Sequence, residues 1–157
     1  GHYTENGQDS IEFMISTNPG ETVKPLGKVA SGGELSRIML AVKSVLADAD
    51  AIETLIFDEI DTGISGRTAQ KVSEKMAVIA RNHQVICITH LPQIAAMADD
   101  HYVIEKSAME QRTITEIYHL SDDASVGEIA RLLGGVEITD AVMQNAREMK
   151  NLAQSKK

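Results

Sequence analysis

Residues 54–61 read Thr-Leu-Ile-Phe-Asp-Glu-Ile-Asp, a short apolar run that ends in two acids, with a third acid at 61. A continuous apolar run of this length is typical of a strand that is buried on both faces, as in a parallel sheet. Ligands of open α/β sheets bind beyond the carboxyl ends of such strands. We therefore expect Asp58 and Glu59 at a ligand-binding edge, although two acids after a strand can also form only a solvated helix cap.

Similar patterns on both sides of this stretch indicate an α/β domain. Val85-Ile86-Cys87-Ile88-Thr89 is a second buried-strand pattern, and it ends at His90. Apolar residues spaced by three or four positions predict helices, and alternation predicts further strands. The helices are expected at 34–48, 68–81, 93–98, 125–133 and 139–153, the last two separated by Gly134-Gly135, and the strands at 11–16, 102–105 and 112–120. Helices alternating with buried strands favour a mainly parallel sheet flanked by helices.

Composition sets the broad class of the protein. The chain has 157 residues, 43% of them hydrophobic and 24% charged, which fits one compact domain over residues 1–157. The net charge of −8 argues against a generally basic surface for nucleic acid or membrane binding. A single cysteine excludes an internal disulfide framework, and no apolar run reaches the roughly 18 residues that span a bilayer, so we expect a cytosolic protein. The opening Gly-His suggests a piece of a longer chain.

A second candidate site is the run Ser31-Gly32-Gly33-Glu34. A serine N-cap with a glutamate three residues later is a capping-box pattern at a helix start. The two glycines allow backbone N–H groups to approach a ligand closely, and a helix N-terminus attracts anions. Two nearby basic side chains would add positive charge: Lys28 and Arg37. The pattern therefore predicts either an anion site or only a flexible turn with a good cap.

The residues after the two buried strands suit phosphoryl chemistry. Asp58 is suited to hold Mg²⁺, mostly through waters that the ion retains. Glu59 points elsewhere than its neighbour and is suited to orient a water for attack on phosphorus. His90 lies where a histidine can donate a hydrogen bond to a phosphate or a polarised water. A lone histidine is more often structural, so its role depends on what lies beside it.

Taken in order along the chain, these motifs resemble those of the ATP-binding-cassette ATPases. Residues 31–34 resemble the signature motif, and residues 55–59 resemble Walker B. Asp61-Thr62-Gly63 falls where the D-loop lies, and His90 falls where the switch histidine lies. The common order and spacing of these motifs make the resemblance specific.

Further details of these motifs narrow the resemblance to one group, the SMC-type chromosome and repair ATPases. Glu34 stands where transporters usually have Gln, and Phe-Asp-Glu-Ile-Asp surrounds Walker B. The longer stretches at 28–41, 89–98 and 130–135 fit bacterial DNA-repair members of this group, and the resemblance covers roughly residues 10–150. The D-loop departs from the transporter pattern, which leaves the role of Asp61 less defined than those of the two acids before it.

A P-loop is not recognisable in the chain. That loop needs Gly-x4-Gly-Lys-Ser/Thr to wrap phosphates, and the near miss Gly27-Lys28-Val29 lacks the hydroxyl residue and the upstream glycine. The resemblance therefore implies a partial P-loop NTPase. The chain would be the carboxy-terminal lobe of an ATPase head, and the Walker A motif would lie in an amino-terminal lobe of the same protein.

The resemblance also implies ATP and Mg²⁺ as cofactors and a head-to-head homodimer as the working state. In it the 31–34 motif, which comprises Ser31, Gly32, Gly33 and Glu34, would contact the γ-phosphate of the opposing head, and Asp61 would lie at the nucleotide. Asp58 would serve Mg²⁺ in its own head, Glu59 would orient the attacking water, and His90 would sense the γ-phosphate.

The expected function is ATP hydrolysis in DNA double-strand-break repair, in the cytoplasm and associated with the nucleoid. We expect DNA contact through the full-length protein, because the local basic residues cluster around the signature (Lys24, Lys28, Arg37, Lys43). The chain alone is expected to be inactive. Two alternatives stay open: a non-catalytic module for head dimerisation or docking, and half of a transporter nucleotide-binding domain, which Glu34 disfavours.

Overall fold

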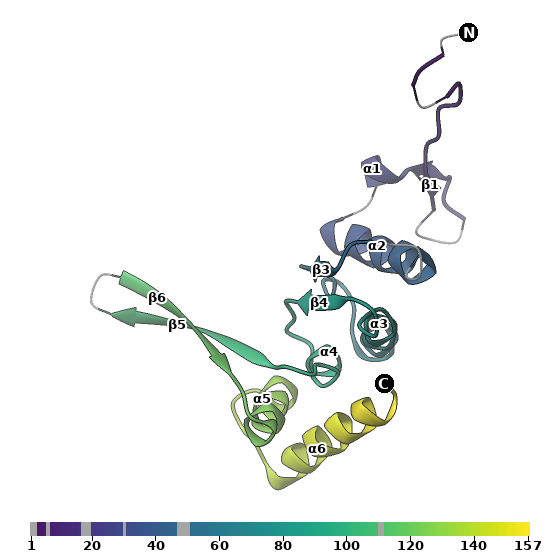
Figure 1. The fold of residues 1–157 in the computed structure, drawn as a ribbon. Helices are drawn as coiled ribbons and strands as arrows, with labels where there is room; N and C mark the ends of the chain where they lie inside the picture. Colours follow the sequence, from purple (N-terminus) through teal and green to yellow (C-terminus); the bar gives the residue numbers. More distant parts are fainter. Residues whose placement is uncertain (1–2, 6, 17–19, 30, 47–50, 110–111) are drawn as a thin grey trace.

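The computed structural model describes residues 3–5, 7–16, 20–29, 31–46, 51–109 and 112–157. The fold is α/β, as the sequence predicts (Figure 1). In chain order its elements are β1 (Met14–Ile15), β2 (Lys24–Pro25), α1 (Leu26–Val29), α2 (Gly32–Leu46), β3 (Thr54–Phe57), α3 (Gly66–Ile79), β4 (Gln84–Cys87), α4 (Pro92–Ala95), β5 (Tyr102–Met109), β6 (Arg112–His119), α5 (Asp122–Gly134) and α6 (Asp140–Ser155).

The described strands form three separate two-stranded sheets. β3 and β4 are parallel and pair in register from Thr54 with Gln84 to Phe57 with Cys87, which confirms the two predicted strands. Their expected burial on both faces is not found among the described residues, because Ile56 is 68% and Ile86 45% exposed. β1 and β2 are antiparallel, and so are β5 and β6. The expected mainly parallel sheet is thus one parallel pair, because β5 satisfies its backbone hydrogen bonds with the next strand of its own hairpin rather than with β4.

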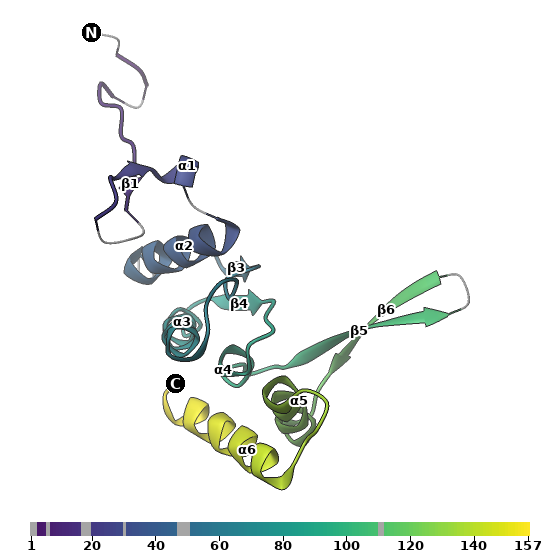
Figure 2. The ribbon, with the colours of Figure 1, turned by 180° about the vertical axis from the view of Figure 1, so that it is seen from behind.

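The β5–β6 hairpin is longer than predicted and projects from the body of the molecule (Figures 1 and 2). The strand expected at 102–105 continues to Met109, because the strand expected at 112–120 pairs with it along its whole length. The strand expected at 11–16 is, by contrast, shorter than predicted, because β1 covers only Met14–Ile15. Ile11 and Phe13, which the predicted alternation places on one side of that strand, are 84% and 74% exposed, since no layer of the described residues covers them.

The main core packs α2, α3 and α4 against one face of the β3–β4 pair. Its fully or nearly buried side chains are Leu40, Leu55, Phe57, Ile60, Val72, Met76, Ile79 and Ile94. The alternation in β3 explains this arrangement, because successive side chains of a strand point to opposite faces. Leu55 and Phe57 are buried, whereas Ile56 between them is 68% exposed.

A second core joins α4, α5 and α6, and its small residues let these helices approach closely. It contains Ala95, Ala96, Ala130, Ala146 and Ala153 together with larger side chains such as Ile129. Ser121 caps α5 and Thr139 caps α6, each side chain accepting a hydrogen bond from the backbone of the first turn. Gly135, at φ +67, ends α5 where the sequence predicts a break.

Helices α2 to α6 agree with the predicted ranges to within about three residues at either end, whereas the short α1 was not predicted. α2 begins at Gly32 and ends at Leu46, and the end predicted at 48 falls outside the described residues. Over the described part of the chain, no helix combines the length and the apolar character needed to cross a bilayer.

Candidate functional site

The start of α2 is held by the predicted capping box. The Ser31 backbone N–H donates to Glu34 Oε2 at 2.9 Å, and the Ser31 hydroxyl donates to the same oxygen at 3.1 Å. The Glu34 backbone N–H donates in turn to Ser31 Oγ at 3.4 Å. These hydrogen bonds, the one from the backbone first, lower the pKa of the Glu34 carboxyl and keep it ionised. The capping prediction is confirmed, and the motif stands at the helix N-terminus where the sequence places it.

The two glycines of this motif allow the loop that follows β3 to pack closely against the start of α2. A Cβ on Gly33 would lie 2.8 Å from the carbonyl oxygen of Glu59, and a Cβ on Gly32 would lie 2.6 Å from Glu59 Oε2. Glu59 itself has φ +57, which is uncommon for a residue with a side chain. The sequence predicted that these glycines make room for a ligand; within this chain they make room for Glu59.

Two further side chains of α2 bind the same loop. The Ser36 hydroxyl donates to the carbonyl oxygen of Asp58 at 3.0 Å. Arg37 donates from Nη1 to the carbonyl oxygens of Ile60 and Thr62 at 3.0 and 2.9 Å. The sequence identified Arg37 only as nearby positive charge, and it did not reveal that this guanidinium ties α2 to the loop. Lys28, the other basic residue named for that purpose, lies exposed on α1.

Both acids at the end of β3 are exposed. Asp58 Oδ1 accepts a hydrogen bond from the backbone N–H of Glu59 at 2.9 Å. The Glu59 carboxylate lies against Gly32 at the start of α2. Among the described residues, no group of three or more His, Cys, Asp or Glu is arranged to hold a metal ion. A lone carboxylate is nevertheless a normal protein ligand for Mg²⁺, which keeps several waters.

Asp61, two residues further on, is buried and contacts the loop after β4. It accepts a hydrogen bond from the Thr89 hydroxyl at 2.6 Å and from the His90 backbone N–H at 2.9 Å. The imidazole Nδ1 of His90 lies 3.0 Å from the same carboxylate oxygen. Burial raises the pKa of the Asp61 carboxyl, but these hydrogen bonds and the nearby imidazole outweigh it, and the net pKa lies below the usual value.

Four of the predicted site residues line one small recess. Asp58, Glu59, Asp61 and His90 surround a hollow of about 270 Å³, together with Thr62, Ile88 and Thr89. The 31–34 motif is not part of its lining, but its two glycines lie against Glu59 and Thr62, which are. Thr89, which lines the recess and donates to Asp61, is a residue that sequence reasoning did not place there. A hydroxyl residue directly before the histidine at a strand end was the available signal.

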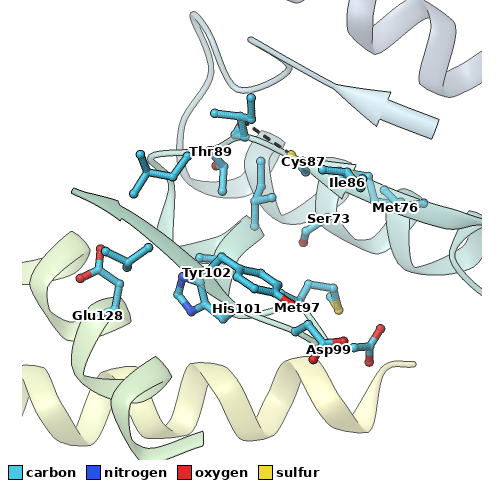
Figure 3. A pocket seen from close by; sticks show the side chains of 18 of the residues that line it. Ser73, Met76, Ile86, Cys87, Thr89, Met97, Asp99, His101, Tyr102 and Glu128 are labelled. Carbon is cyan, nitrogen blue, oxygen red and sulfur yellow. Dashed lines mark hydrogen bonds between the residues drawn. The ribbon is translucent and has the colours of Figure 1, made fainter. Parts of the chain in front are cut away.

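A much larger hollow separates β4 from β5 (Figure 3). Its volume is about 1310 Å³, and its walls include Ile86 and Cys87 of β4, Tyr102 of β5 and Glu128 of α5. Burial, then the charges of Asp61 and Asp58, raise the pKa of the Cys87 thiol to about 12. Beside this hollow, the outer face of the parallel pair is bare: Ile56, Ile86 and Ile88 are 68%, 45% and 52% exposed.

Comparisons with known proteins agree with the motif resemblance. No protein-family model matches the chain. It is 52% identical over 153 residues to the DNA repair protein RecN of Halalkalibacterium halodurans, a match that covers 98% of this chain and 27% of that protein. RecN of Bacillus subtilis is 51% identical over 146 residues, which cover 93% of this chain and 25% of that protein. The chain thus spans about a quarter of the length of these curated relatives.

A solved structure shares the fold. It comes from work described as "Structural biochemistry of ATP-driven dimerization and DNA stimulated activation of SMC ATPases". The TM-score is 0.50 at 18% sequence identity, over 79% of this chain and 81% of the other. At that identity the likeness concerns the fold alone. The similarity to RecN confirms the predicted resemblance, and the chain is similar in sequence to the carboxy-terminal lobe of RecN.

Proposed function

We propose, from the similarity of the chain to RecN over nearly its whole length, that it serves an SMC-like head that hydrolyses ATP in DNA double-strand-break repair. The observation that carries the proposal is the recess, where the acids after β3 meet the histidine after β4. Parallel strands put their carboxyl ends at one edge, which is where α/β proteins bind ligands. As a cytoplasmic, nucleoid-associated protein, the full-length molecule would contact DNA outside this acidic lobe.

Three residues of the recess have distinct roles in this proposal. Asp58 would hold Mg²⁺, and its exposed carboxylate fits an ion that keeps most of its waters. When bound, that ion would neutralise charge on the nucleotide phosphates. Glu59 would orient the attacking water by accepting a hydrogen bond from it. His90 would donate a hydrogen bond to the γ-phosphate, and Asp61 would line the nucleotide site beside it.

The start of α2 would serve the opposing head of a homodimer. The 31–34 motif presents backbone N–H groups at the positive end of a 15-residue helix, and this favours an anion such as the γ-phosphate. Because Gly32 contacts Glu59 in the same chain, a phosphate bound to the motif would lie near the residue proposed to orient water. This arrangement would connect dimer formation with hydrolysis.

The Walker A motif would come from an amino-terminal lobe that covers the bare face of the parallel pair. Parallel sheets are almost always covered on both faces, whereas Ile56, Ile86 and Ile88 of this face are exposed here. The hollow between β4 and β5 adjoins that face and leaves room for further chain. We propose that the present chain supplies the signature, Walker B, D-loop and switch histidine, and that it is inactive alone.

Mixing the two lobes tests this division. The present chain and the missing amino-terminal part of the full-length protein are purified separately, and phosphate release is measured for each and for the mixture. We expect turnover only in the mixture. Ile86→Lys should abolish association in size-exclusion chromatography, whereas Val45→Lys, at an 85% exposed position on α2, should not. Robust hydrolysis by this chain alone would refute the split site.

The bare isoleucine face also favours a second candidate, a non-catalytic lobe that serves only in docking. Such a lobe would associate with its partner through Ile56, Ile86 and Ile88 just as the catalytic one would. The same experiment separates the two functions. Association that depends on Ile86 but yields no phosphate release would support docking alone.

A further inference from the structure

The two loops that carry the recess residues are joined through one buried carboxylate. Asp61 is only 4% exposed, yet three groups from the loop after β4 reach it. Two of these are the Thr89 hydroxyl and the His90 backbone N–H, at 2.6 and 2.9 Å. The third is the imidazole of His90, whose Nδ1 lies 3.0 Å from Oδ2. All three contacts use the same oxygen atom.

This contact bears on which ring nitrogen carries a proton. An ionised carboxylate offers only lone pairs, and an unprotonated Nδ1 would bring another lone pair to within 3.0 Å of them. Electrostatic repulsion at this distance therefore favours the proton on Nδ1 of His90. In a histidine, the hydrogen bond made by one nitrogen decides what the other can do. The remaining nitrogen, Nε2, belongs to a side chain that is 70% exposed and lines the recess with Asp58 and Glu59.

We propose that Asp61 is a positioning residue, which keeps the proton on Nδ1 of His90 and turns Nε2 toward the recess. The proton arrangement stands on the geometry alone; its use in ATP hydrolysis rests on the function proposed above. If Nε2 takes up a proton from solvent and donates it in a hydrogen bond to a phosphate oxygen, the ring becomes an imidazolium. The carboxylate of Asp61 would then stabilise that cation without itself becoming protonated.

The ¹⁵N NMR spectrum of the histidine-labelled chain tests the arrangement, because protonated and unprotonated ring nitrogens have distinct shifts. His90→Gln identifies the signals of this residue among the five histidines. We expect Nδ1 to be the protonated nitrogen in the unmodified chain. A predominant Nε2–H tautomer there would overturn the proposal without any variant of Asp61.

Two substitutions separate positioning from a merely structural role. Asp61→Asn replaces the acceptor by an amide that can donate to Nδ1, and we expect the ring proton to move to Nε2 in most molecules. Thr89→Val removes a hydrogen bond from the same carboxylate but leaves its contacts with His90, and we expect Nδ1 to stay protonated. Equal tautomer populations in Asp61→Asn and the unmodified chain would contradict the proposal, as would an equal shift in both variants.

ATP hydrolysis by the full-length protein then tests the use of this arrangement. We expect Asp61→Asn to lower kcat by roughly 10–100-fold, the size of effect that partners orienting a histidine have at metal sites. The tautomer is measured without nucleotide, so a failure of the proposed ATPase function would leave the NMR result unchanged. A moved proton with an unchanged kcat would refute the positioning role in hydrolysis.

Discussion

Arg37 on α2 donates a hydrogen bond from Nη1 to the carbonyl oxygen of Thr62 at 2.9 Å, although 25 positions separate the two residues. The same Nη1 donates to the carbonyl oxygen of Ile60 at 3.0 Å. Glu59 precedes these two carbonyls in the chain, so the arginine fixes the loop that carries it. Helix α2 and the loop after β3 are therefore one connected unit.

Replacing this arginine should destabilise the chain. Arg37→Met leaves two carbonyl oxygens without their charged donor, and we expect the free energy of unfolding to fall by about 1–3 kcal/mol. Arg37→Lys should recover only part of this, because an ammonium group lacks the planar fork of the guanidinium. Urea denaturation measures the change. The matched control is Arg67→Met, at an exposed position in the first turn of α3, where we expect a change within about 0.5 kcal/mol.

Alanine at Gly33 should be costly because backbone surrounds it. The new Cβ would lie 2.8 Å from the carbonyl oxygen of Glu59 and 3.0 Å from that of Thr62, and neither can turn aside as a side chain can. We expect Gly33→Ala to lower the free energy of unfolding by about 1–3 kcal/mol.

Gly127 in α5 provides the control for this substitution. A Cβ there meets nothing within 4 Å, and alanine is the better helix former. Gly127→Ala should therefore raise the free energy of unfolding by about 0.5–1 kcal/mol. Equal effects of the two substitutions would show that the close approach at Gly33 is not real.

Local patterns predicted the parts of this molecule that local interactions create. The capping box of Ser31 and Glu34 spans three residues, and its hydrogen bonds form within one helical turn. The paired strands β3 and β4 were recognisable because a short continuous apolar run is typical of strands in a parallel sheet. The order of the acids and the histidine along the chain was enough to indicate one site, and the structure brings them to one recess.

Contacts between segments that are distant in the sequence could not be predicted from local patterns. Nothing near Asp61 in the sequence reveals that it is buried against Thr89, 28 positions away. Arg37 carries the same positive charge whether it faces a ligand or two carbonyls, and only the tertiary structure decides between them. The full extent of β5 was missed because its stability depends on cross-strand pairing with β6 rather than on its own residues.

The histidine at 101 should make stability depend on pH. Burial, and then the charge of Lys150, lower its pKa from the ordinary value of 6.5. The unfolded chain therefore takes up a proton before the folded chain does, and the free energy of unfolding should fall as the pH drops below about 6.5. Between pH 7.5 and 5.5 this loss should appear in urea titrations of the unmodified chain. His101→Asn should reduce it; an identical pH dependence in the variant would assign the effect elsewhere.

The thiol of Cys87 should be unreactive in the folded chain. Its pKa is raised to about 12, chiefly by burial, so very little thiolate is present at pH 8, and the thiolate is the nucleophile. Alkylation followed by mass spectrometry should be slow in buffer and fast in concentrated urea. Rapid, complete labelling of the folded chain would mean that the hollow beside β4 is open to solvent.

The most direct test of the ATPase proposal is Glu59→Gln in the full-length protein, with ATP binding and phosphate release measured separately. The amide keeps the shape of the side chain but no longer offers a carboxylate to the attacking water. The proposal predicts retained ATP binding and a fall in kcat of about 100-fold or more. Glu53→Gln, an exposed acid just before β3, is the control and should leave kcat unchanged. Hydrolysis by Glu59→Gln near the wild-type rate would contradict the proposed site.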